Sequence, residues 1–107
     1  MPHYLIQASL TPEAMAAAIK NPQNRREAVR PVIEGMGGHL EAYYFAFGEH
    51  DAYVLVEMPD NVSAAAIAMA VGASGALKSY QTTVLMTAEE AMEAMRKAGG
   101  VGYRPPG

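Results

Sequence analysis

The sequence contains no cysteine among its 107 residues. Disulfides, thiolate nucleophiles and cysteine-ligated zinc or iron–sulfur sites are therefore excluded. A chain of this size without cross-links must be stabilised by packing, either within itself or against a partner subunit.

Charge is also scarce, because only 18% of the residues are charged and the net charge is −3. The basic residues are scattered except for Arg25, Arg26 and Arg30, so no basic stripe could follow a phosphate backbone, and nucleic acid is not expected as a partner. There is no apolar run near twenty residues and no amino-terminal signal pattern. We therefore expect a soluble, cytoplasmic protein with no membrane partner.

Half of the residues are hydrophobic, which is typical of a folded globular chain. The length fits one domain, which we place at residues 1–98. Residues 99–107 contain four glycines and two prolines with little apolar surface, so we expect a flexible tail.

The most informative segment is 41–58, where two aromatic and β-branched runs flank Gly48-Glu49-His50-Asp51. This pattern predicts a β-hairpin closed by those four residues. Closure there would place Phe47 opposite Ala52, and Tyr43, Phe45 and Phe47 beneath the helices.

The remaining elements follow from alternation and capping signals. Residues 4–10 and 77–86 read as strands, and Thr11, Asn24, Asp60 and Thr87 are placed to cap helices. Pro31 should bend the second helix or mark its true start. The order β-α-β-β-α-β plus a terminal helix predicts an α+β, ferredoxin-like fold, with a four-stranded antiparallel sheet and helices on one face only.

The uncovered sheet face should carry Leu5, Gln7 and Ser9 from the first strand. The hairpin would add Ala42, Tyr44 and Ala46 with Tyr53, Leu55 and Glu57. Such a face is too apolar to remain in water, so we expect the chain to pair with a copy of itself through it.

Residues 25–60 resemble the GYD-domain family of small bacterial and archaeal proteins. The resemblance runs through the helix at 25–33, Gly37-Gly38, Phe45-Ala46-Phe47-Gly48, and 54–60. In the naming motif Gly-x-Tyr-Asp, Gly48 and Asp51 match, and His50 replaces the tyrosine. The resemblance implies the architecture of the dimeric α/β-barrel group, which includes cofactor-free oxygenases and isomerase-like proteins, and it implies no particular reaction.

Glu57 is the first candidate for chemistry, because a carboxylate desolvated at a subunit interface could act as a general base. Tyr44, Tyr53 and Gln7 are candidate ligand-binding groups on the same face. An interface hydrogen bond is the alternative role for Glu57.

His50 and Asp51 could form a base and its orienting carboxylate. Turn formation, with Asp51 accepting backbone N–H groups, explains them as well. Arg26 and Arg30 lie one helical turn apart and could bind a carboxylate or phosphate, or they could form a solvated face with Arg30 paired to Glu34.

His39 and Glu41 share a strand face, but two ligands do not make a metal site, and we expect no metal and no cofactor.

Two functions stay open. One is a homodimeric protein that binds a small organic ligand in an interior pocket between sheet and helices, with cofactor-free proton-transfer or oxygenase-like activity. The other is a non-catalytic interaction or regulatory module.

Overall fold

A computed structural model describes residues 1–107 and contains four strands and four helices. Their order and bounds are β1 (His3–Leu10), α1 (Pro12–Lys20), α2 (Arg25–Gly35), β2 (His39–Phe45), β3 (Ala52–Glu57), α3 (Asn61–Ala73), β4 (Leu77–Leu85) and α4 (Ala88–Ala98).

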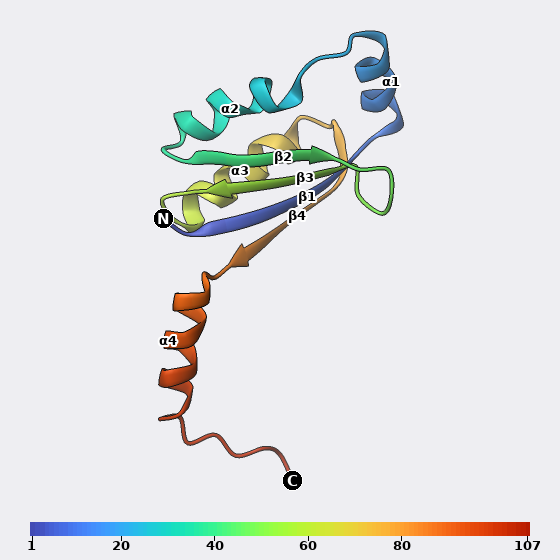
Figure 1. The fold of residues 1–107 in the computed structure, drawn as a ribbon. Helices are drawn as coiled ribbons and strands as arrows, with labels where there is room; N and C mark the ends of the chain where they lie inside the picture. Colours follow the sequence, from blue (N-terminus) through green and yellow to red (C-terminus); the bar gives the residue numbers. More distant parts are fainter.

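The strands form one antiparallel sheet in the order β2-β3-β1-β4. Each βαβ crossover skips a strand, which gives the split, ferredoxin-like arrangement. Figure 1 shows α2 and α3 on one side of this sheet, while its other side carries no helix. The predicted fold class, with a four-stranded sheet and a terminal helix, is confirmed.

The hydrophobic core lies between the sheet and the two covering helices. Its helical contribution comes from Ile33 of α2 and from Ala64 and Ile67 of α3. The strands and the chain after β3 contribute Tyr4, Ile6, Leu40, Ala52, Val54, Val56 and Met58. A space of about 10 Å³ lies among these side chains, which is room for one water molecule at most. This space is too small for the organic ligand that was expected between sheet and helices.

All four predicted helix caps are present. The side chains of Thr11, Asn24, Asp60 and Thr87 accept backbone N–H groups at the starts of α1, α2, α3 and α4. Thr87 also forms the full capping box with Glu90. Pro31 lies inside α2, so that helix begins at Arg25 and not at the proline.

The hairpin differs from the prediction in the length of its loop. Phe45, not Phe47, opposes Ala52, because β2 stops two residues earlier than predicted, β3 starts at Ala52 as predicted, and residues 46–51 form the loop. Phe47 lies in this loop and is fully exposed, so its expected place beneath the helices is wrong. The shift is two residues, and side chains alternate with period two, so the hairpin residues that lie in the strands keep their predicted faces. Ala46 lies in the loop and not on the open face, and Phe45 is 56% exposed, so the helices do not bury it as expected.

The loop also folds back over the end of β1, which changes the surroundings of Ser9. The Ser9 hydroxyl donates to the Glu49 carbonyl, 3.4 Å away, and Ser9 is buried. Ser9 therefore keeps its place in the β1–β4 ladder on the same face as Leu5 and Gln7, but the loop covers it and it is not open to solvent.

Gly38 allows β2 to start close against the end of β3. A Cβ atom at this position would lie 2.5 Å from the Glu57 carbonyl oxygen and 2.5 Å from the Met58 sulfur. Gly37, just before it, has φ +81°, a conformation that favours glycine. These two residues turn the chain from α2 into the sheet beside Glu57.

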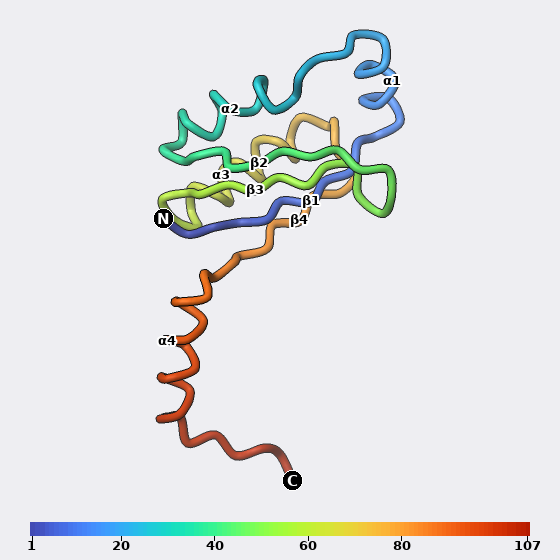
Figure 2. The backbone as a smooth tube through the Cα atoms, in the orientation of Figure 1, coloured from blue at the N-terminus to red at the C-terminus, as the bar shows by residue number.

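The last helix, α4, extends away from the sheet and leads to the carboxyl terminus (Figure 2). None of its residues is buried, and Met92 and Met95 on its apolar side are 48% and 71% exposed. Residues 101–107 adopt no helix or strand. No helix in the chain is both long enough and apolar enough to span a bilayer.

Candidate functional site on the open sheet face

The face of the sheet without helices carries alternate residues from all four strands; we call it the open face. Leu5 lies at its centre and opposes Leu55 on one side and Thr83 on the other. Ala42 also opposes Leu55. The centre of the open face is therefore mainly apolar, while polar groups lie toward both ends.

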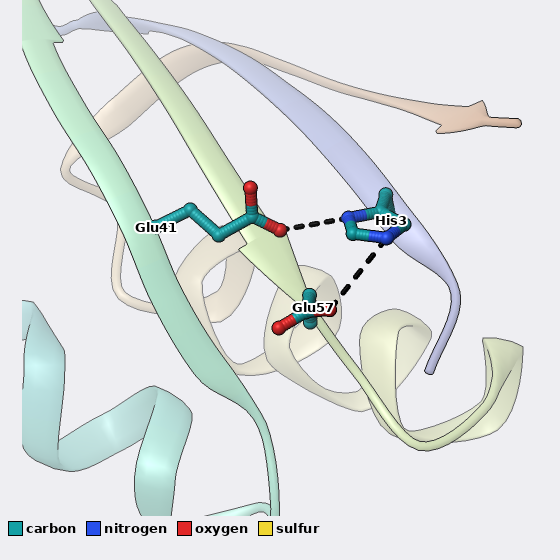
Figure 3. Close-up of side chains that lie close together, drawn as sticks. All are labelled: His3, Glu41 and Glu57. Atoms are coloured by element: carbon teal, nitrogen blue, oxygen red, sulfur yellow. Dashed lines mark hydrogen bonds and ion pairs between the residues drawn. The ribbon is translucent and has the colours of Figure 1, made fainter. Parts of the chain in front are cut away.

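At one end, His3, Glu41 and Glu57 come together from three different strands, and we call them the His3 cluster (Figure 3). The His3 Nδ1 atom lies 2.7 Å from Glu41 Oε1, and the Nε2 atom lies 3.6 Å from Glu57 Oε1. The three side chains are 31%, 34% and 28% exposed, in that order. One imidazole is thus placed between two carboxylates, with a ring nitrogen toward each.

Two features of the sheet produce this arrangement. His3 directly opposes Glu57 in the β1–β3 ladder. In β2 the register shifts between Leu40 and Ala42, which is a β-bulge with Glu41 as the extra residue. From the bulge, the Glu41 side chain reaches across β3 to the imidazole on β1.

A groove of about 200 Å³ opens beside the cluster. Its lining combines the polar His3 and Glu41 with apolar and hydroxyl side chains, namely Leu55, Leu85, Met86 and Thr87. The four strands contain no arginine and one lysine, Lys78, which lies at the register shift of β4 beside Ser9 and Leu10, at the opposite end of β1 from His3. The groove therefore suits a neutral or cationic group better than an anion.

The other end of the open face carries Tyr44 and Tyr53, which oppose one another, and Gln7, which opposes Tyr53. Tyr53 lies four residues from Glu57 along β3, about 13 Å at roughly 3.3 Å per residue. Within one chain, the two tyrosines and the glutamate therefore do not converge on one small ligand.

His50 packs edge-on against Tyr53, with ring centroids 5.9 Å apart. Its Nδ1 atom is buried and has no hydrogen-bond partner. The neighbouring Asp51 carboxylate accepts the backbone N–H of Leu10 at 2.8 Å. Asp51 thus holds the hairpin loop against β1 and makes no hydrogen bond to the His50 ring.

Arg26 and Arg30 lie on α2, in the helical layer behind the sheet. The Arg30 guanidinium donates to the Glu27 carboxylate at 3.2 and 3.3 Å, not to Glu34 as expected. This hydrogen bond and its charge lower the pKa of Glu27 and raise that of Arg30. The two arginines are separated by the sheet from the groove and the His3 cluster.

Two members of the cluster, His3 and Glu41, were not proposed together from the sequence. The link between His3 and Glu57 depends on the β1–β3 register, which alternation alone leaves undetermined. The position of Glu41 depends on the bulge, for which the β2 sequence offers no glycine or other signal.

The comparisons with known proteins now add the family. The GYD domain family matches residues 4–95, which span β1 from its second residue, the other three strands and most of α4. The chain belongs to the GYD domain family. None of the curated proteins that were compared with it matches.

In this GYD domain, the motif at 48–51 forms the last four of the six residues in the loop between β2 and β3. Asp51 matches the motif and fastens the loop through the Leu10 N–H. At the motif's tyrosine position, the His50 ring packs on Tyr53. The motif therefore has a clear structural role here, because it closes the tyrosine end of the open face.

Proposed function

We propose that this GYD domain acts as a homodimer that binds a small organic molecule on the open face. The observation that carries the proposal is the groove of about 200 Å³ beside the His3 cluster, at the edge of an apolar sheet surface. A second copy packed on this surface would bury Leu5 and Leu55 and would also cover the groove.

The groove's composition favours a carbonyl compound over an organic acid. Glu41 and Glu57 would repel an anionic ligand, and no arginine or lysine of the strands lies at this end of the sheet to compensate for them. A neutral carbonyl group can accept a hydrogen bond from an N–H at His3 Nε2, which lies 3.6 Å from Glu57 Oε1 and makes no hydrogen bond there.

Proton transfer is the reaction that these groups could perform without a cofactor. The Glu57 carboxylate would remove a proton from the carbon beside the carbonyl, and His3 would donate a hydrogen bond to the oxygen where charge develops. His50 and Asp51 are far along the sheet from this groove, so Glu57 is preferred as the base.

The proposal can be tested by native mass spectrometry of tag-free protein purified gently from cells. We expect a dimer that carries an organic adduct, and loss of that adduct in Glu57→Gln but not in the control Glu49→Gln, which changes an exposed loop residue. A monomer, or a dimer whose adduct survives the Glu57 change, would contradict the proposal.

One observation favours the second candidate, a non-catalytic interaction module. The groove is open, and it is smaller than the roughly 300 Å³ at which ligand pockets begin. In this case the open face would serve assembly alone. A stable dimer that never carries an adduct, and that keeps its assembly when Glu57 is changed to Gln, would support this function.

A further inference from the structure

The His3 cluster combines three metal-ligating side chains in a way that the proposed proton transfer does not require. Glu57 and His3 would suffice for proton transfer, yet Glu41 also reaches across a whole strand to the same imidazole. One donor atom from each residue lies within 4.8 Å of the other two.

We propose that His3, Glu41 and Glu57 form a binding site for a divalent transition-metal cation. The inference does not depend on the proposed function, because all three ligands come from one chain. One imidazole nitrogen with two carboxylate oxygens suits Mn²⁺, Fe²⁺, Co²⁺ or Zn²⁺. Ca²⁺ would need six to eight oxygen ligands, which the cluster does not provide.

The charge balance of the open face supports a cation at this place. Two carboxylates face a single imidazole, and the strands offer no arginine or lysine at this end of the sheet as a counter-charge. A divalent cation between them would neutralise both carboxylates. It would take the place of the His3–Glu41 hydrogen bond, whose 2.7 Å separation must widen slightly to admit an ion.

The position of the cluster on rigid elements also suits a metal. His3 and Glu57 lie opposite each other in the β1–β3 ladder, and the bulge fixes the backbone of Glu41. Three protein ligands leave coordination positions free, as catalytic metal sites do, and the groove lined by His3 and Glu41 lies directly beside them.

The test is titration of tag-free, chelator-treated protein with Co²⁺, Mn²⁺ and Zn²⁺, followed by calorimetry and by the visible absorption of Co²⁺. We expect saturable binding of one ion per chain. His3→Gln, Glu41→Gln and Glu57→Gln should each weaken it by about tenfold or more, while the control Glu49→Gln should not. Circular dichroism spectra will show that each variant is folded.

A second measurement needs no variant. In NMR spectra of the wild-type protein, substoichiometric Mn²⁺ should broaden the backbone signals of His3, Glu41 and Glu57 first and leave those of residues 48–51 sharp. Absence of saturable binding below millimolar metal, or broadening spread evenly over exposed carboxylates, would overturn the site. An organic adduct and a metal ion differ in mass, so failure of this inference is distinguishable from failure of the proposed function.

Discussion

The two faces of the sheet are built from alternate residues of the same strands, yet they meet different surroundings. Ile6 and Val54 face the helices and are buried, whereas their neighbours Leu5 and Leu55 face outward and are only partly covered. The chain supplies α2 and α3 for one face and no element for the other. The comparison teaches that an aliphatic residue in a strand can be called buried only when the layer that packs against its face is known.

The largest expected effect comes from removing a side chain on the covered face. Ile6→Ala should lower the free energy of unfolding by about 2–5 kcal/mol, because it leaves a cavity among core residues. The matched change Leu5→Ala, one residue away on the open face, should cost less, and its cost should depend on protein concentration if a second copy covers it. Urea unfolding at two concentrations measures both, and equal costs in dilute protein would contradict the difference between the faces.

A charge introduced on the open face should weaken the association of two copies of the chain. Leu55→Asp places a carboxylate at the centre of the proposed interface, so light scattering should show monomers or aggregates in place of dimers. Gln23→Asp, which adds the same group to the exposed segment between α1 and α2, is the control. An unchanged dimer in Leu55→Asp would show that another surface forms the contact.

A smaller effect is expected from the hydroxyl of Tyr4 on the covered face. It donates to Asn61 Oδ1 at 2.6 Å, and burial raises the pKa of the phenol. Tyr4→Phe removes this bond and should cost about 1 kcal/mol in urea unfolding. Tyr53→Phe on the open face, where the hydroxyl has no such partner, should change the free energy less; the reverse ranking would contradict the assignment of the faces.

The smallest effect concerns how the stability of the protein depends on pH through Asp60, which caps α3. The backbone N–H of Ser63 donates to the Asp60 carboxylate and lowers its pKa below the ordinary 3.8. A pKa lowered by folding stabilises the protein above the unfolded value, and this stabilisation is lost as pH falls through the folded value. The stability of wild type relative to Asp60→Asn should therefore decrease on acidification below about pH 4. If the urea midpoints of the two proteins changed by equal amounts between pH 5 and pH 2, the expected contribution of Asp60 would be wrong.

Local signals were sufficient for the order of elements and for the helix starts. Thr11, Asn24, Asp60 and Thr87 cap helices because short side chains bind nearby N–H groups whatever the tertiary structure. The face on which each β3 side chain lies could also be predicted, because it follows from strict alternation along one strand. The fold could thus be predicted well from the sequence.

The features that build the site depend on non-local geometry. The bulge at Glu41 and the opposition of His3 to Glu57 arise from pairing between strands far apart in the chain. The loop at 46–51 is longer than the turn signal indicated, because it also binds β1 through Ser9 and Asp51. The terminal helix α4 was predicted, but the exposure of all its residues was not, because capping signals do not show what a helix packs against.

The most direct test of whether a second copy covers the open face uses the absence of cysteine, since a single introduced cysteine is the only thiol in the chain. Tyr44 on the open face is 67% exposed in the single chain, and Phe47 in the loop is 105% exposed. The thiol of Tyr44→Cys should react with a maleimide much more slowly than that of Phe47→Cys in concentrated protein, and should approach the same rate on dilution. Equal rates at every concentration, with both variants folded, would show that no second copy covers the open face.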